Sequence, residues 1–324
     1  MRGTIHPGRK RLNMKRRCGA LRARDLLLSL LIAAPLLADE PAAEAPRVEA
    51  QVDVEARLRD LATKYRVKMV HEAPRFPVQL HDGQIRGRAA DKEKLAGYLP
   101  IFAKEFARYP VEFVKRSGLR RVVFCEELAW DDQLRAAIPH FADRTLYLDV
   151  ARGAEDERYQ RRVLHHEFFH IVDEVDDGLL YRDDRWSAAN PEGFRYGAGG
   201  HAAQTTAETG TLSDKYPGFL NHYSTTGVEE DKAEIFAHLY LDPAELARRA
   251  ETDAVLHVKV ELMKRLLEEF CPEMERRRPP FEQLTRRRQF ETLRENDVVS
   301  AFGQLRGSSV VSVFKSSSVP RIAT

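Results

Sequence analysis

Apolar and polar positions follow a regular period over residues 53–275 and lose that regularity on either side. Apolar residues at every third or fourth position predict helices, whereas short runs rich in Val, Phe, Tyr and Leu predict strands. The predicted helices cover residues 54–65, 91–110, 155–175, 228–240, 242–250 and 253–270, and the predicted strands cover 68–74, 120–128 and 144–152. Pro100 is expected to interrupt the second helix, because proline removes a backbone N–H donor. Strands precede the 155–175 helix and helices follow it, so the pattern predicts an α+β fold.

The first 38 residues have the features of a secretory signal peptide. They carry nine Lys/Arg residues and one acidic residue, and the apolar run LLLSLLIAAPLL occupies positions 26–37. Twelve residues with a proline are too few to span a bilayer comfortably. We therefore expect cleavage after Ala38, a secreted or periplasmic protein, and no stable membrane insertion of the mature chain. An uncleaved N-terminal anchor is the alternative, and Met14 offers a second start site.

The balance of charge changes once this leader is set aside. The whole chain has a formal net charge of +2, but residues 39–324 carry 43 basic and 49 acidic residues. An excess of acid over base does not favour nucleic-acid binding. Composition divides the remainder into an Ala/Pro/Glu-rich linker at 39–52, a domain at 53–275 and a charged, partly ordered tail at 276–324.

Two of the three cysteines, Cys125 and Cys271, lie beyond the leader, which contains Cys18. An even number of cysteines in an oxidising compartment permits a disulfide. Two buried thiols are the alternative, because Cys125 lies in a run typical of a strand.

The helix predicted at 155–175 contains the segment VLHHEFFHIVDEV, in which residues 166–170 match the pattern H-E-x-x-H. Projected at 100° per residue, one face holds the apolar residues Leu164, Phe168, Ile171, Val172 and Val175. His166 and His170 lie together on the opposite face. Two neutral imidazoles one turn apart can share a zinc ion, and Glu167 is placed where it can reach a zinc-bound water. The alternative is a polar face that simply contacts solvent.

A third metal ligand must come from another position. The glycine and histidine that continue H-E-x-x-H in one class of zinc peptidases are replaced by Asp173 and Asp176. Asp176 remains a candidate ligand, although no glycine turns the chain back toward the metal. His201 and His222 are further candidates, but neither lies at a useful helical spacing.

Glu230 is the stronger candidate for the third ligand. Thr226 and Glu229 fit a capping box, which predicts a helix start near Gly227 with Glu230 in its first turn and Glu234 one turn later. A ligand carboxylate with a second carboxylate behind it suits a zinc site whose histidines need hydrogen-bond acceptors. An ordinary acidic helix start, favoured by the helix dipole, explains the same residues.

Taken together, the segments HEFFHIVD and YSTTGVEEDKAEIFA resemble the gluzincin metallopeptidases related to the anthrax lethal factor catalytic domain and the Pro-Pro endopeptidases. They are also similar to bacterial proteins described as zinc-binding metallopeptidases. In that family a tyrosine precedes the glutamate ligand by seven residues, and Tyr223, Glu230 and Glu234 match its spacing. The resemblance implies a zincin-like fold, in which a small mixed sheet and the H-E-x-x-H helix are followed by a helical C-terminal subdomain.

The resemblance also implies a role for each site residue. One Zn²⁺ per chain would be held by His166, His170 and Glu230, with Glu167 as general base, Tyr223 as oxyanion stabiliser and Glu234 supporting a ligand histidine. The pair Asp231-Lys232 departs from the aromatic pair often found in the family, which bears on packing more than on chemistry.

These residues predict a secreted zinc endopeptidase whose partner is a protein or peptide substrate. A zinc amidase acting on cell-wall peptides and a zinc-stabilised interaction protein without turnover are the alternatives, and the general base disfavours the second of these. In the long segment 176–225, Trp186, Phe194 and Tyr196 either line a substrate groove or fix the loop to the core.

Overall fold

The computed structural model describes residues 45–199 and 210–276, and the side chains from residue 54 onward. The predicted signal peptide, and the predicted tail after Arg276, lie outside these residues. Within the described part, no helix is both long and apolar enough to cross a membrane.

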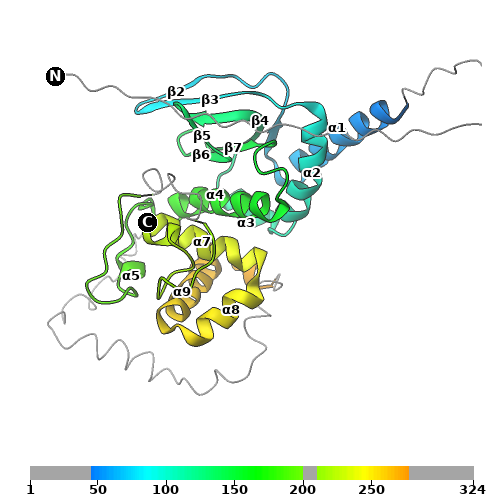
Figure 1. Cartoon of the computed structure of the whole chain (residues 1–324). Coiled ribbons are helices and arrows are strands. Elements are labelled where there is room, and N and C mark those ends of the chain that lie inside the picture. Colours follow the sequence, from blue (N-terminus) through cyan, green and yellow to red (C-terminus); the bar gives the residue numbers. More distant parts are fainter. Residues whose placement is uncertain (1–44, 200–209, 277–324) are drawn as a thin grey trace, which may run out of the picture. The chain divides into compact units, whose positions relative to one another are not determined.

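Seven strands form a mixed sheet around a central strand, β4 (Figure 1). The strands are β1 (Lys68–Val70), β2 (Val78–Leu80), β3 (Gly83–Ala89), β4 (Arg121–Trp130), β5 (Gln133–Leu134), β6 (Ala137–His140) and β7 (Thr145–Asp149). β1 and β3 pair with one edge of β4, and β7 and β5 pair with the other. β1 and β7 run parallel to β4, and the remaining pairings are antiparallel. β4 is buried along most of its length, as a strand covered on both faces must be.

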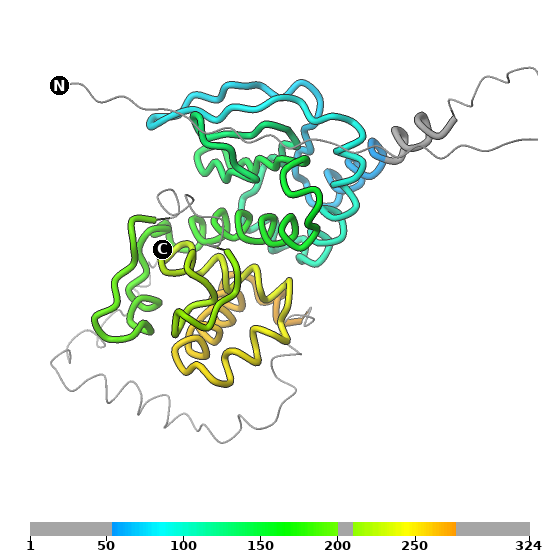
Figure 2. The backbone as a smooth tube through the Cα atoms, in the orientation of Figure 1, coloured from blue at the N-terminus to red at the C-terminus, as the bar shows by residue number. Residues whose placement is uncertain are grey.

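The helices pack on this sheet and on one another. They are α1 (Ala45–Tyr65), α2 (Lys92–Phe106), α3 (Val111–Arg116), α4 (Glu157–Asp177), α5 (Asp184–Ser187), α7 (Val228–Leu241), α8 (Pro243–Thr252), α9 (Ala254–Phe270) and α10 (Glu273–Arg276), with a 3₁₀ turn at Tyr223–Thr225. α4 lies between the sheet and the C-terminal helices (Figure 1), and it contacts β6 and β7 on one side and α7 on the other. Between α4 and α7, the described part of the chain is mostly irregular apart from α5 and the 3₁₀ turn (Figure 2).

The α+β class with a small mixed sheet is confirmed, and each predicted helix and strand is present. Two details differ from the prediction. α2 continues through Pro100 without a break, because one missing N–H removes a single hydrogen bond while the apolar face of the helix stays buried on both sides of it. α1 begins at Ala45, inside the segment assigned to the linker. The short β2–β3 hairpin, α3 and β6 had no periodicity long enough to predict them.

Local sequence explains why α4 begins and ends where it does. The carboxylate of Asp156 accepts a hydrogen bond from the backbone N–H of Tyr159 and so caps the first turn. Gly178 closes the last turn with a φ of 74°, a left-handed conformation that costs glycine little. The predicted apolar stripe faces the core, since Leu164, Phe168 and Ile171 are fully buried.

An aromatic cluster joins α4 to the helices that cover the sheet. The Phe168 ring lies 4.9 Å from the Tyr109 ring, 5.5 Å from the Phe106 ring and 6.0 Å from the Phe113 ring, measured between centroids. Rings at these distances contribute packing and ring–ring attraction in addition to the burial of apolar area. The cluster therefore fixes the position of α4, and with it the side chains on the opposite face of the helix.

Replacing Phe168 by alanine should lower the free energy of unfolding by about 3–5 kcal/mol, because the cavity it leaves among three rings cannot close. Denaturant unfolding measures the change. The control is Leu179→Ala, whose side chain is 55% exposed, and its effect should stay within about 0.5 kcal/mol. A loss below about 1 kcal/mol for Phe168→Ala would show that the cluster does not hold the helix.

Candidate metal centre

Three ligand atoms from α4 and α7 converge on one point. His166 Nε2 lies 2.8 Å from Glu230 Oε2 and 3.1 Å from His170 Nε2, and the distance from His170 Nε2 to Glu230 Oε2 is 3.5 Å. All three side chains are buried. The histidines are neighbours because they lie one helical turn apart, and the glutamate reaches them because α7 packs along α4.

The geometry and the chemistry of this group fit a zinc ion. Ligand atoms at 2.0–2.1 Å from a tetrahedral zinc lie about 3.3 Å from one another, and the three distances here are close to that value. Two imidazole nitrogens and one carboxylate oxygen are ligand types that zinc accepts. Three protein ligands leave a fourth position for water or substrate, as in catalytic rather than structural zinc sites.

The electrostatics of the group also favour a cation. Burial lowers the pKa of His166, but its contacts with Glu230 and Glu234 outweigh burial and raise that pKa to about 10. Burial raises the pKa of Glu230, but the two histidines lower it by more, to well below its usual range. The carboxylates beside His166 thus favour a positive charge at this position, and a bound divalent metal would take the place of the proton.

Glu234 lies behind His166 and is held in place by two further side chains. Its Oε1 lies 2.9 Å from His166 Nδ1 and also accepts from the Arg162 guanidinium, while its Oε2 accepts from Asn221 Nδ2 at 2.7 Å. Burial raises the pKa of Glu234, but Arg162 and His166 lower it by more, to about 2. A carboxylate at Nδ1 leaves Nε2 of His166 free to bind a metal. Sequence reasoning missed Arg162, although it lies one turn before His166, and nothing in the sequence marked Asn221.

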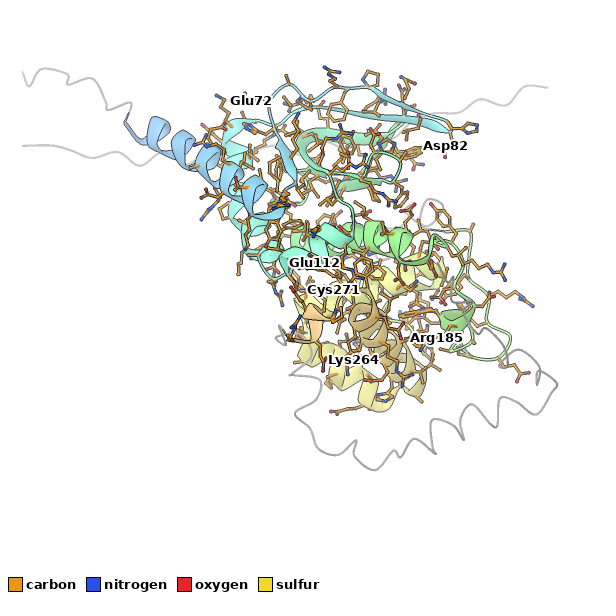
Figure 3. The ribbon with its side chains drawn as sticks, turned by 180° about the vertical axis from the view of Figure 1, so that it is seen from behind. Glu72, Asp82, Glu112, Arg185, Lys264 and Cys271 are labelled. Carbon is orange, nitrogen blue, oxygen red and sulfur yellow. The ribbon has the colours of Figure 1, made fainter. Side chains whose placement is uncertain are left out.

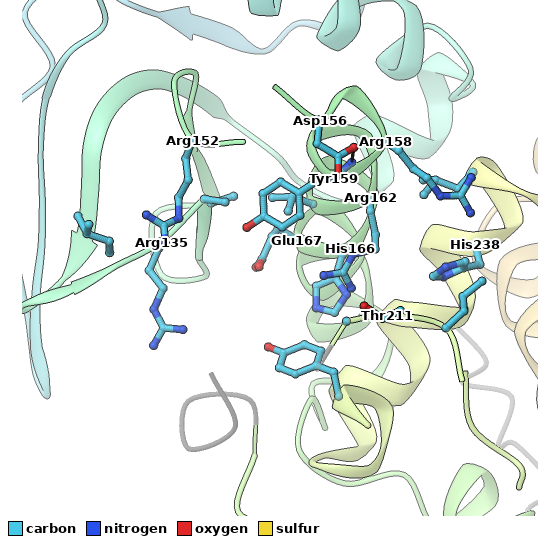
Figure 4. Close-up of a pocket in the computed structure, with 18 residues that line it drawn as sticks. Arg135, Arg152, Asp156, Arg158, Tyr159, Arg162, His166, Glu167, Thr211 and His238 are labelled. Atoms are coloured by element: carbon cyan, nitrogen blue, oxygen red, sulfur yellow. Dashed lines mark hydrogen bonds between the residues drawn. The ribbon is translucent and has the colours of Figure 1, made fainter. Parts of the chain in front are cut away.

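Glu167 and Tyr223 line a cavity that His166, one of the three candidate ligands, also lines. Figure 4 shows Glu167 and His166 side by side at this cavity. The cavity has a volume of about 700 Å³, and His166, Glu167, Tyr159 and Tyr223 contribute to its lining. Burial raises the pKa of Glu167, more than the neighbouring histidines lower it. The Tyr223 ring lies 5.7 Å from the His166 ring, measured between centroids. A carboxylate with a raised pKa and a phenol therefore border the same space.

Two of the other three candidate ligands, Asp176 and His222, do not join this group. Asp176 is exposed at the end of α4, and His222 is exposed before the 3₁₀ turn. Neither belongs to a cluster of metal-ligating atoms within the residues described. His201 lies outside those residues.

The capping box predicted at the start of α7 is wrong. Gly227 is the N-cap residue and no side chain caps the helix, although the predicted start is correct to one residue. The Thr226 hydroxyl instead donates to the Tyr223 carbonyl at 2.7 Å, because the preceding 3₁₀ turn brings that carbonyl within reach. The hydroxyl thus stabilises the turn that carries Tyr223.

Buried charges on α7 fix the long segment between the two helices. Asp231 accepts hydrogen bonds from Trp186 Nε1 and the Tyr196 hydroxyl, each at 2.8 Å, and it pairs with Lys259 at 2.8 Å. Phe194 packs on Phe219, with 4.5 Å between ring centroids. The sequence left open whether these aromatic residues line a substrate groove or fix the loop to the core. These contacts favour the second interpretation.

Lys232 forms a second buried ionic group. Its ammonium contacts Asp173 of α4 and lies 3.1 Å from Asp183, which caps α5. Burial lowers the pKa of Lys232, but the two carboxylates outweigh burial and raise it. Burial raises the pKa of Asp173 to about 6, against the lowering effect of Lys232. One ammonium therefore joins α4, α5 and α7.

Both cysteines beyond the leader are free and buried, so the thiol alternative is confirmed. Cys125 lies in β4, whereas Cys271, labelled in Figure 3, directly follows α9. The last residue of α9, Phe270, packs on Phe113 of α3. Burial raises the pKa of both thiols, which keeps them protonated and unreactive.

Comparison with known proteins yields one structural likeness. No protein family and no curated protein matches the chain. Among solved structures, it is similar to a crystal structure of a "putative zinc-binding metallo-peptidase" from Bacteroides caccae ATCC 43185, with 16% sequence identity and a TM-score of 0.46. The alignment covers 73% of this chain and 94% of that chain. At this identity and TM-score the likeness assigns no function.

Removal of one ligand should abolish metal binding without unfolding the protein. We expect one zinc per chain in the wild type and little or none in His170→Ala and Glu230→Ala, because two ligands hold zinc far more weakly than three. Elemental analysis after dialysis measures the content. Asp176→Ala is the matched control and should keep its zinc. Full zinc in Glu230→Ala together with loss in Asp176→Ala would move the third ligand to Asp176.

Replacing Lys232 by methionine removes the ammonium that Asp173 and Asp183 share. Uncompensated buried carboxylates should lower the free energy of unfolding by about 3–5 kcal/mol near pH 7.5. The loss should be smaller near pH 5. Without the ammonium, the pKa of Asp173 rises further above its unfolded value, so the folded state binds a proton more readily and gains stability as the pH falls.

Denaturant unfolding at both pH values measures this effect. Lys115→Met serves as the control, since its ammonium is largely exposed and lies 3.4 Å from Glu112. It should change stability by less than about 1 kcal/mol. A penalty for Lys232→Met that is equal at both pH values would contradict the role given to Asp173.

Proposed function

We propose that this protein is a zinc-dependent peptidase of the gluzincin type, with a zincin-like fold. The observation that carries the proposal is the convergence of two histidines and a glutamate from α4 and α7, beside a cavity that Glu167 and Tyr223 border. The leader further supports export to the periplasm or the medium. The substrate would be a protein or peptide, and the cleavage that of an endopeptidase.

His166, His170 and Glu230 would hold the zinc, and Glu234 would orient His166. When bound, zinc lowers the pKa of a coordinated water toward about 7 and polarises the peptide carbonyl. Glu167 accepts the proton of the attacking water as the water oxygen bonds to the carbonyl carbon. Tyr223 donates a hydrogen bond to the carbonyl oxygen as it gains negative charge. Glu167 then returns the proton to the amide nitrogen and the C–N bond breaks. The second proton of the water also passes to that nitrogen, so a carboxylate and an ammonium group leave.

The raised pKa of Glu167 suits this role. A general base is most effective when its pKa lies near the working pH, and burial moves Glu167 in that direction. A zinc site that only stabilises a fold has four protein ligands and needs no base beside it. The cavity and the base therefore support turnover over a purely structural role.

Glu167→Gln should keep zinc and fold but lose peptide hydrolysis by about 10²–10⁴-fold in kcat, because glutamine cannot accept the proton. Tyr223→Phe should lose about 10²–10³-fold, the usual cost of one oxyanion donor. Cleavage of a mixed peptide library, followed by mass spectrometry, measures both. Equal rates for Glu167→Gln and wild type would refute the mechanism, and zinc binding without any cleavage would favour an interaction protein.

A further inference from the structure

We propose that the cavity selects peptides that carry a carboxylate close to the cleaved bond, and that Arg135 and Arg152 recognise it. This inference rests on the proposed peptidase function. It names the chemistry of the substrate, which the metal centre alone does not determine.

Basic side chains outnumber acidic ones around the cavity. Its lining includes four arginines, Arg135, Arg152, Arg158 and Arg162, against the carboxylates of Asp156 and Glu167. Beyond the leader the chain has more acidic than basic residues, so this local excess of positive charge runs against the composition of the protein. A cavity lined by one sign of charge concentrates ligands of the opposite sign.

Two of the four arginines already have carboxylate partners. Arg162 pairs with the buried Glu234, and Arg158 lies 3.6 Å from Asp242. Asp156 does not neutralise the others, because its carboxylate caps the first turn of α4. The unbalanced charge therefore belongs to Arg135 and Arg152.

Neither of these two guanidinium groups has a carboxylate partner among the described residues. Arg135 is partly buried, and its Nη2 donates to the neutral amide of Gln133 at 2.8 Å. Arg152 is exposed, and no hydrogen bond or ion pair of its guanidinium is found within the described part of the chain. Each guanidinium thus keeps donors for a ligand, and a guanidinium can bind a carboxylate through two parallel hydrogen bonds.

The backbone holds both residues in place. The N–H of Arg135 donates to Leu128 of β4 at 2.8 Å, and the N–H of Arg152 donates to Asp149 Oδ1 at 3.0 Å at the end of β7. Figure 4 shows the two arginines on one wall of the cavity, across from Glu167 and His166 on α4. A peptide lying between these walls would meet the base on one side and the arginines on the other.

The recognised carboxylate should lie within a residue or two of the cleaved bond. Arg135 and Glu167 line the same cavity and lie on facing walls of it (Figure 4). Since Glu167 would act at the cleaved bond, a group that contacts Arg135 across this cavity lies close to that bond. The carboxylate could belong to an Asp or Glu side chain or to the C-terminus of the peptide, and the chemistry of recognition is the same.

The test compares matched peptides that differ only in charge. One pair carries Glu or Gln beside the cleaved bond, and a second pair ends in a free carboxylate or an amide. We expect the acidic member of at least one pair to be cleaved about ten-fold faster in kcat/KM, the usual effect of one charge-assisted contact. The pair that shows the preference identifies the source of the carboxylate. Raising the salt concentration should reduce the preference.

Variants assign the preference to the two arginines. Arg135→Gln and Arg152→Gln should each reduce the ratio of the two kcat/KM values several-fold, and the double variant should remove it. Arg248→Gln is the matched control, because this exposed arginine on α8 pairs with Glu245 away from the cavity. It should keep the wild-type ratio.

The outcomes separate this inference from the proposed function. Equal cleavage of acidic and neutral peptides by an active wild type would overturn the selectivity and leave the peptidase standing. If no peptide is cleaved, the binding of labelled acidic and neutral peptides to the chelator-treated protein is measured by fluorescence anisotropy. This measurement tests anion recognition without turnover. Binding of acidic peptides that depends on both arginines would support anion recognition while the peptidase fails, and equal or absent binding of both peptides would overturn the inference.

Discussion

Helices α4 and α7 pack so closely that the charged side chains between them are removed from water, and each must find its partner inside the protein. Three contacts between the helices meet this requirement: His166 and His170 with Glu230, Arg162 and His166 with Glu234, and Asp173 with Lys232. A buried charge without a partner is costly, so a sequence that places these charges here permits one relative position of the helices. The geometry that keeps the fold together is also the geometry of the candidate metal centre.

Helix α7 carries a second set of contacts outward from this interface. Asp231 holds the segment after α4 through Trp186 and Tyr196, and it is itself neutralised by Lys259 of α9. Of the 14 residues of α7, 13 are buried. Glu230 lies beside Asp231 and Lys232, so the loop, the C-terminal helices and the candidate third metal ligand depend on the same turn of one helix. The polar pair that departs from the resembled family is therefore a packing element of this protein.

Two arginines that have no carboxylate partner among the described residues face the metal-binding side of the cavity. Glu167 lies on α4 next to His166, whereas Arg135 and Arg152 line the opposite wall (Figure 4). The separation has a physical advantage, because a carboxylate of the substrate bound near the metal ligands would be repelled by Glu167 and Glu230. In the selectivity we propose, Arg135 and Arg152 would offset that repulsion and orient an acidic peptide across from Glu167.

The sequence by itself determined the features that depend on near neighbours. The period of α4, the shared face of His166 and His170, and the start of α7 all follow from spacings of a few residues. Glu230 was predicted through the spacing of a resembled motif. Only the tertiary structure decided that Asp231 and Lys232 are buried and that Arg162 and Asn221 hold Glu234. Those partners lie far apart in sequence, and Arg162 and Glu234 are 72 residues apart. In addition, an acidic helix start has the same local sequence pattern whether water or another helix covers it, so the pattern does not predict burial. Which distant side chains pair depends on which helix and sheet surfaces pack together. The periodicity of apolar positions along the chain does not predict that packing.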